Sequence, residues 1–199
     1  MSGLKKKRLL TTLKYTWPFY IVTALLIALL MNFIFSFAHR LPSYQTLTIF
    51  ISGEITEPKK LKEELLDKYE EKELKSVTLI SSKINDSSYQ TKLSVTGYNS
   101  SDLLIIPLSI CDNINVSSFS LELADELINK YYSMYHFYKQ GDEQYGIKLN
   151  NAAISKYVAL PNEDCYLFLN GKSENLGEYS TKGNSQHNIV LNLAKEWGM

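Results

Sequence analysis

The sequence contains few of the residues that most often carry out chemistry. Among 199 residues there are only three histidines and two cysteines. Beyond residue 40 the histidines are His136 and His187, and no H-E-x-x-H or C-x-x-C metal-binding pattern occurs. The sequence also lacks a G-x-S-x-G motif, a phosphate-binding loop and a dinucleotide fingerprint. We therefore expect a protein that is not an enzyme and that uses no metal or other cofactor.

The two cysteines, Cys111 and Cys165, allow at most one disulfide in an oxidising compartment. Cys111 follows an apolar segment that we expect to be a buried strand, and Cys165 starts another. The spacing does not decide between a disulfide and two free thiols. We favour two buried thiols that pack as small apolar side chains.

Residues 18–38 contain no charged residue and read PFYIVTALLIALLMNFIFSFA. A helix needs roughly 20 consecutive apolar residues to cross a bilayer, and it satisfies its own backbone polar groups there. Five basic residues and no acidic residue precede this segment: Lys5, Lys6, Lys7, Arg8 and Lys14. The sequence therefore predicts a basic head over residues 1–17 and one transmembrane helix over residues 18–38.

The charges are unevenly distributed along the chain. Residues 1–40 hold six of the 21 lysines and arginines and none of the 21 acidic residues, which leaves residues 41–199 with a net charge of about −6. Basic flanks tend to stay in the cytoplasm, so we expect a cytoplasmic head, a tether at 39–46 and an extracytoplasmic domain at 47–199. The bilayer is then a partner, whereas the acidic domain argues against nucleic acid.

A cleaved signal peptide is the alternative interpretation of the apolar segment. Ser36-Phe37-Ala38 supplies small residues at the spacing that a signal peptidase prefers. The apolar stretch is longer than the roughly 7–15 residues usual for a signal core, so we favour an uncleaved anchor. Both interpretations place residues 41–199 outside the cytoplasm.

The pattern of residues 47–199 predicts an α/β fold: a single three-layer lobe with a mostly parallel sheet flanked by helices. Apolar runs bounded by turn residues alternate with segments of helical spacing. Leu103–Pro107 is apolar throughout, which is typical of a strand buried on both faces of a parallel sheet. Expected strands lie at 47–51, 77–80, 102–107, 145–149, 154–160 and 165–169, and expected helices start at Pro58 and lie at 88–95, 121–139 and 185–197.

Three segments carry a resemblance to a known family. Residues 47–107, which end in Asp102-Leu103-Leu104-Ile105-Ile106-Pro107, resemble the first lobe of bacterial extracellular solute-binding proteins. The tract 145–149 is similar to the return to that lobe's sheet, and 166–172 is similar to the strand that crosses to a second lobe. Only about a dozen residues separate Leu176 from the last expected helix. The resemblance therefore implies a shortened, one-lobed relative without clamshell closure, which requires two bodies.

The ends of the first two expected strands are the candidate ligand site. Open α/β sheets bind ligands beyond the carboxyl ends of their strands, where hydroxyls and free amides can hold an anion or a polar solute. We expect Gly53 to lie in an exposed turn that tolerates substitution by valine. The alternative is a pair of ordinary strand-to-helix turns. The candidate ligand-binding residues are Ser52, Gly53, Glu54, Ser81 and Ser82.

The segment YYSMYHFY at residues 131–138 is unusually aromatic. On the expected helix it would form either an interface for a partner or a face packed in the core. The candidate interface residues are Tyr131, Tyr132, Tyr135 and Tyr138.

Two functions follow from these features. The first is a membrane-anchored extracytoplasmic binding or accessory module that serves, for example, a transporter. The second is a structural subunit of a membrane protein assembly with no small-molecule ligand. Ala24, Ala28 and Asn32 lie four residues apart on the apolar helix, and small or polar residues at this spacing permit close helix packing.

Overall fold

The computed structural model describes residues 3–38, 41–72, 74–181 and 187–198. The chain forms two compact units, Met1–Leu41 and Pro42–Met199. The first unit is the helix α1, Gly3–Ala38, which includes both the basic head and the apolar segment. Within it, Tyr15–Phe35 is long and apolar enough to cross a membrane.

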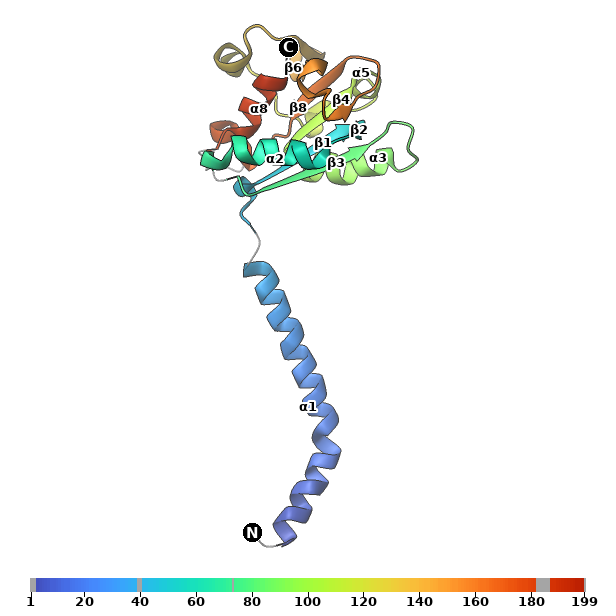
Figure 1. The fold of residues 1–199 in the computed structure, drawn as a ribbon, viewed down its shortest axis with the longest axis vertical. Coiled ribbons are helices and arrows are strands. Elements are labelled where there is room, and N and C mark those ends of the chain that lie inside the picture. Colours follow the sequence, from blue (N-terminus) through green and yellow to red (C-terminus); the bar gives the residue numbers. More distant parts are fainter. Residues whose placement is uncertain (1–2, 39–40, 73, 182–186, 199) are drawn as a thin grey trace. The chain divides into compact units, whose positions relative to one another are not determined.

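The second unit is built on a six-stranded mixed sheet in the order β3-β1-β4-β8-β6-β5 (Figure 1). A separate two-stranded sheet pairs β2 with β7. The strands are β1 Thr46–Ser52, β2 Glu54–Ile55, β3 Ser76–Ser82, β4 Leu103–Pro107, β5 Phe137–Gln140, β6 Glu143–Lys148, β7 Val158–Ala159 and β8 Cys165–Leu169. The longer helices are α2 Pro58–Lys68 and α8 Ile189–Trp197. The shorter turns of helix are η1 Ser43–Gln45, η2 Glu70–Lys72, α3 Tyr89–Lys92, η3 Leu93–Gly97, α4 Tyr98–Ser100, α5 Leu108–Cys111, η4 Val116–Ser118, α6 Asp125–Leu127, η5 Ile128–Tyr132, α7 Asn151–Ile154 and η6 Glu174–Tyr179.

The α/β class is confirmed, but the sheet is parallel only in part. β1 pairs in parallel with β3 and with β4, as the first half of the chain predicts. β8 runs antiparallel to both β4 and β6, and β5 joins β6 in an antiparallel hairpin. The expectation of a mostly parallel sheet is therefore wrong for the β8-β6-β5 half, in which every strand pair is antiparallel and a tight turn joins β5 to β6.

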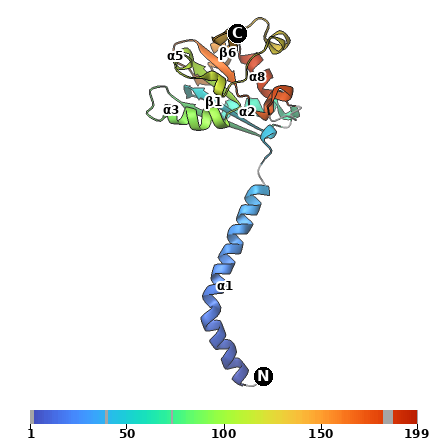
Figure 2. The ribbon, with the colours of Figure 1, turned by 180° about the vertical axis from the view of Figure 1, so that it is seen from behind.

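The central strand β4 is buried on both faces, as its continuous apolar sequence predicts. All five of its residues are buried. Leu103 and Ile105 belong to one hydrophobic cluster, and Leu104 and Ile106 belong to a second. Helices α2 and α8 contribute to the first cluster, and they lie close together in both views of the domain (Figures 1 and 2). The segments α3 and η3 contribute to the second cluster.

The expected helix over 121–139 is the largest error. The chain is helical only from Asp125 to Tyr132, in α6 and η5, and it then enters β5. Gly141, with φ of 67°, makes the tight turn between β5 and β6. Gly146 on β6 leaves room for a ring, because a Cβ there would lie 2.8 Å from Cε1 of Phe168. The end of the aromatic segment therefore forms strand β5, because it pairs with β6 and packs beside Phe168.

Other expected elements are shifted or shortened. Residues 154–160 form no single strand: α7 ends at Ile154, and only Val158–Ala159 are extended. The tether is shorter than expected, because η1 and the first residue of β1 fall within 39–46, of which 39 and 40 lie outside the described residues. The last helix begins at Ile189, and the expected start near Ser185 also lies outside the described residues.

Candidate functional site

A shallow depression lies at the carboxyl ends of β1, β3 and β4, where the sequence predicts a ligand site. Its volume is about 470 Å³, and residues from four separate parts of the chain line it. These include Gly53 and Glu54 after β1, Lys83 and Asn85 after β3, Ser109 after β4, and Leu160 and Glu163 before β8. We call this the strand-end depression.

The structure brings only part of the predicted site to this depression. Gly53 and Glu54 line it, whereas Ser81 belongs to β3 and does not. Ser52 is fully buried, and its hydroxyl lies 2.7 Å from the hydroxyl of Tyr89. Ser82 is also buried, and its Oγ donates to Asp86 at 3.4 Å. Successive side chains of a strand point to opposite faces, so adjacent residues at a strand end cannot all face the same ligand.

The expectation of an exposed turn at Gly53 is wrong. Gly53 is buried, and a Cβ there would lie 2.7 Å from the backbone oxygen of Ala159. The crowding arises because β2, which follows directly, pairs with β7. Valine at this position would therefore disturb the fold itself, so its effect on binding would have no simple interpretation.

The charged groups at the strand-end depression already have partners within the protein. Lys83 Nζ lies 2.6 Å from Glu54 Oε2, and this hydrogen bond and charge raise the pKa of the exposed Lys83. The backbone N–H and the Oγ of Ser109 donate to the two carboxylate oxygens of Glu163, both at 2.9 Å. Glu163 thereby occupies the position at the start of α5 that an anion would otherwise seek. The rim is polar and internally paired, and the exposed surface between the pairs is partly apolar.

The four candidate interface tyrosines do not share one surface. Tyr132 is buried in the first hydrophobic cluster and donates its hydroxyl to the carbonyl of Leu191 at 2.9 Å, and burial raises its pKa. Tyr138 lies in β5 and packs in the second cluster on the other face of the sheet. Tyr131 and Tyr135 are half-buried against the first cluster. The core alternative is therefore right for Tyr132 and Tyr138.

The remaining exposed part of this segment borders an open depression of about 510 Å³ beside α8. Met134 is 91% exposed there, next to Tyr131 and Tyr135. Tyr135 donates its hydroxyl to the carbonyl of Lys195 at 2.8 Å. Lys130 lies 5.4 Å from the ring centre of Tyr131 and forms an ion pair with Glu178. We call this surface, formed by Lys130, Tyr131, Met134, Tyr135 and Lys195, the aromatic surface.

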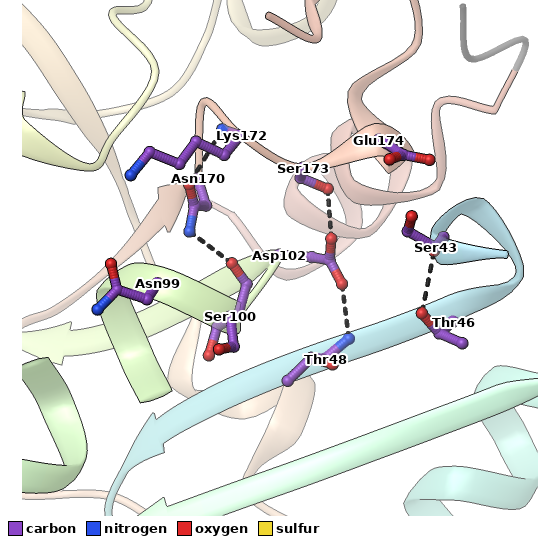
Figure 3. Close-up of a pocket in the computed structure, with 11 residues that line it drawn as sticks. Ser43, Thr46, Thr48, Asn99, Ser100, Asp102, Asn170, Lys172, Ser173 and Glu174 are labelled. Carbon is purple, nitrogen blue, oxygen red and sulfur yellow. Dashed lines mark hydrogen bonds between the residues drawn. The ribbon is translucent and has the colours of Figure 1, made fainter. Parts of the chain in front are cut away.

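Sequence reasoning missed a third hollow, a polar pocket of about 200 Å³ at the opposite ends of β1 and β4 (Figure 3). Asp102 accepts the backbone N–H of Thr48 at 2.7 Å through Oδ2 and the hydroxyl of Ser173 at 2.5 Å through Oδ1. Asn170 donates to the carbonyls of Ser101, at 2.7 Å, and Tyr98, at 3.0 Å. The only signal in the sequence is that a polar residue borders each of two apolar runs, Asp102 before β4 and Asn170 after β8.

This polar pocket joins three segments of the chain. Charge-assisted bonds to Asp102 tie the start of β1 and the loop after β8 to the start of β4. Both carboxylate oxygens of Asp102 therefore accept hydrogen bonds from within the protein.

The two cysteines lie in the core. Both thiols are free and buried, which agrees with the interpretation favoured from the sequence. Burial raises the pKa of Cys165 to about 12 and that of Cys111 further, so neither is a thiolate near neutral pH. Among the described residues, no group of three or more histidine, cysteine, aspartate or glutamate side chains is placed to bind a metal.

Comparison with models of known protein families, with curated proteins and with solved structures finds no match.

Proposed function

We propose that this protein is a membrane-anchored extracytoplasmic binding module, a one-lobed, three-layer relative of bacterial solute-binding proteins. The observation that carries the proposal is the strand-end depression, because open α/β sheets bind their ligands at this edge. The helix α1, with its uncleaved apolar segment and basic head, holds the domain at the outer surface of the membrane.

The depression favours a protein ligand over a free small solute. Small-molecule sites enclose most of their ligand, whereas this depression is open and belongs to a single lobe. Its charged groups are paired, and its apolar part includes Leu160 and Pro161. An open surface that combines apolar side chains with paired polar groups is typical of a protein interface. The partner we propose is a transporter or another protein of the same membrane.

Site-specific crosslinking in native membranes tests this proposal. A photoreactive residue replaces Asn85, which is exposed and lines the strand-end depression. We expect it to crosslink to one membrane protein, identified by mass spectrometry. The matched control places the same residue at Asn99, which lines the polar pocket at the other end of the strands. Equal crosslinking from both positions, or crosslinking from Asn99 alone, contradicts the proposed site.

Blocking the depression gives an independent measurement. Asn85→Trp should abolish copurification of the crosslinked partner, because an indole would fill part of the depression. Asn99→Trp should leave copurification unchanged. If both variants retain the partner with unchanged yield, the strand-end depression is not the binding site.

Cysteine labelling tests the orientation. In a background without Cys111 and Cys165, a cysteine at Ser43 should react with a membrane-impermeant reagent on intact cells. A cysteine at Ser2 should remain protected until the membrane is opened. The reverse pattern contradicts an extracytoplasmic domain.

The aromatic surface favours a second candidate function, that of a structural subunit in a membrane protein assembly. A fully exposed methionine beside half-exposed tyrosines is common at protein interfaces. Met134→Glu should then release the partner while Asn85→Trp does not, which separates the two functions.

A further inference from the structure

The two edge strands of the six-stranded sheet, β5 and β3, differ in the features that protect an edge from pairing with another strand. The β5 edge is only four residues long, carries the exposed Lys139 and has a register shift at Tyr138/Lys139. A short strand, a charge and a bulge are the usual means by which proteins prevent other strands from pairing with an edge. The β3 edge has none of these features. It is seven residues long, pairs in unbroken register with β1, and contains no charge, proline or glycine.

The outer side of β3 is open in the described part of the chain. β3 is the last strand of its sheet, and no further strand pairs with it among the described residues (Figure 1). Alternate residues of such a strand direct their backbone N–H and C=O groups away from the sheet. The side chains are also incompletely covered: Leu79 packs on the first hydrophobic cluster and Ile80 on the second, yet both remain half-exposed. An added strand would extend both clusters.

The residues that flank β3 indicate which strand fits. Lys75 and Lys83 are both exposed, one directly before the strand and one directly after it. In an antiparallel pair of two β3 strands centred on Leu79, Lys75 of each copy would lie opposite Lys83 of the other. Like charges opposite each other destabilise a strand pair, so pairing between two copies of this chain is disfavoured. A strand with an acidic residue beyond each end is favoured by the same rule.

Two acidic side chains contact Lys83: Glu54 forms an ion pair with its Nζ at 2.6 Å, and the carboxylate of Asp86 accepts its backbone N–H at 3.1 Å. Lys83 and Glu54 are both more than half exposed, so their ion pair contributes little to stability, and another carboxylate can replace Glu54. Lys83 also lines the strand-end depression. A strand added to β3 would therefore run to the rim of that depression.

We propose that β3 is a docking edge for an extended segment of another protein, which adds as a further strand and carries an acidic residue beyond each end. This is β-strand addition, in which backbone hydrogen bonds give affinity and the flanking charges give selectivity. The proposal goes beyond the function proposed above, because it concerns the edge of the sheet, which meets the strand-end depression at Lys83, and requires no ligand in that depression.

Peptide binding to the full-length protein in detergent micelles tests the docking edge. The probe is a fluorescent peptide in which alternating threonines and valines match the seven residues of β3 and one glutamate is added beyond each end. The control peptide has a lysine at each end. By fluorescence anisotropy, the glutamate-flanked peptide should bind about tenfold more tightly, from two cross-strand charge pairs. Lys75→Glu should remove most of this difference, whereas Lys139→Glu on the β5 edge should leave it unchanged.

Two neighbouring proline variants locate the binding edge. The N–H groups of Thr78 and Leu79 point to opposite sides of the strand, so one of them faces β1 and the other faces outward. Proline at the outward position should abolish peptide binding with little loss of stability, and proline at the other position should destabilise the fold.

Three results overturn the proposal. They are equal affinity for the two peptides, retained binding in a stable proline variant, and dimers formed through β3 in place of peptide binding. These results concern only the docking edge β3. The crosslinking expected from Asn85 tests the strand-end depression, so either proposal can be contradicted without the other.

Discussion

Substitution of Gly53 by alanine should destabilise the domain, although the residue lies at a strand end beside an open depression. The added Cβ would lie 2.7 Å from the backbone oxygen of Ala159 and 3.4 Å from Cδ2 of Leu160. The oxygen belongs to β7, which is held by its pairing with β2, so it cannot move away as the end of a flexible side chain could. Overpacking of this kind typically costs about 1–3 kcal/mol. For a chain of this size, the melting temperature should fall by roughly 2–4 °C for each kcal/mol.

The assay is thermal unfolding of the full-length protein in detergent, followed by circular dichroism. Gly171→Ala is the matched control, because the nearest atom to its added Cβ is the backbone nitrogen of Leu121 at an ordinary 3.7 Å. We expect the control to unfold at the temperature of the wild type. If Gly53→Ala also does so, the contact between the β1–β2 turn and β7 is not tight, and the assignment of this position to the fold is wrong.

Three further predictions concern the core. Ile105→Asp should prevent stable folding, since loss of a buried isoleucine alone costs roughly 2–5 kcal/mol and the new charge has no access to water. Ile105→Val, measured by urea unfolding, should lower the unfolding free energy by only about 0.5–1.5 kcal/mol. Tyr132→Phe should lower the unfolding free energy by about 1 kcal/mol, because it removes a buried hydrogen bond. Tyr135→Phe removes an exposed hydrogen bond and should lower it less; equal losses of unfolding free energy would contradict the difference in burial. Burial raises the pKa of Cys165 from its ordinary 9.0, and that of Tyr89 from 10.0, to about 12 in each case. Because the unfolded chain then loses these protons first, the contribution of the two groups to the unfolding free energy should fall as the pH rises from 9 towards 12; an unfolding free energy that is flat over that range would contradict it.

The first half of the domain follows closely from its sequence, because local pattern and tertiary environment agree there. Leu103–Pro107 is apolar at every position, and the strand is buried on both faces. Pro58 begins α2, where a missing N–H has no cost, and Leu61 and Leu65 are its buried residues. The parallel order of β3, β1 and β4 follows from the short helical crossovers between them.

The second half could not be predicted in the same way, because its pattern fits two structures. The tyrosines at 131, 132, 135 and 138 have the spacing of a helix, yet Tyr138 also alternates with its neighbours as a strand residue does. The choice depends on β6, which supplies a partner and a glycine opposite the rings. A local stretch of sequence does not reveal this pairing between β5 and β6.

The position of the strand-end depression was predictable from the fold class, but the side chains facing it were not. Open α/β sheets bind ligands beyond the carboxyl ends of their strands, and Gly53 and Glu54 do line the depression at those ends. Whether a hydroxyl near that edge faces outward depends on strand orientation and on what packs beneath it. Ser52 faces Tyr89, and Ser82 faces Asp86, so both serve the fold.

The same pairing bears on what the domain can hold. A solute site needs polar groups whose bonds are open until the ligand arrives, since breaking internal bonds costs free energy. Around the strand-end depression, Ser109 is bonded to Glu163 and Lys83 to Glu54. Among the described residues, no strand pairs with the outer side of β3, and the lysines that flank β3 are exposed. Backbone groups in a row match another extended chain and no small solute. For this reason both of our proposals name a polypeptide partner and not a solute.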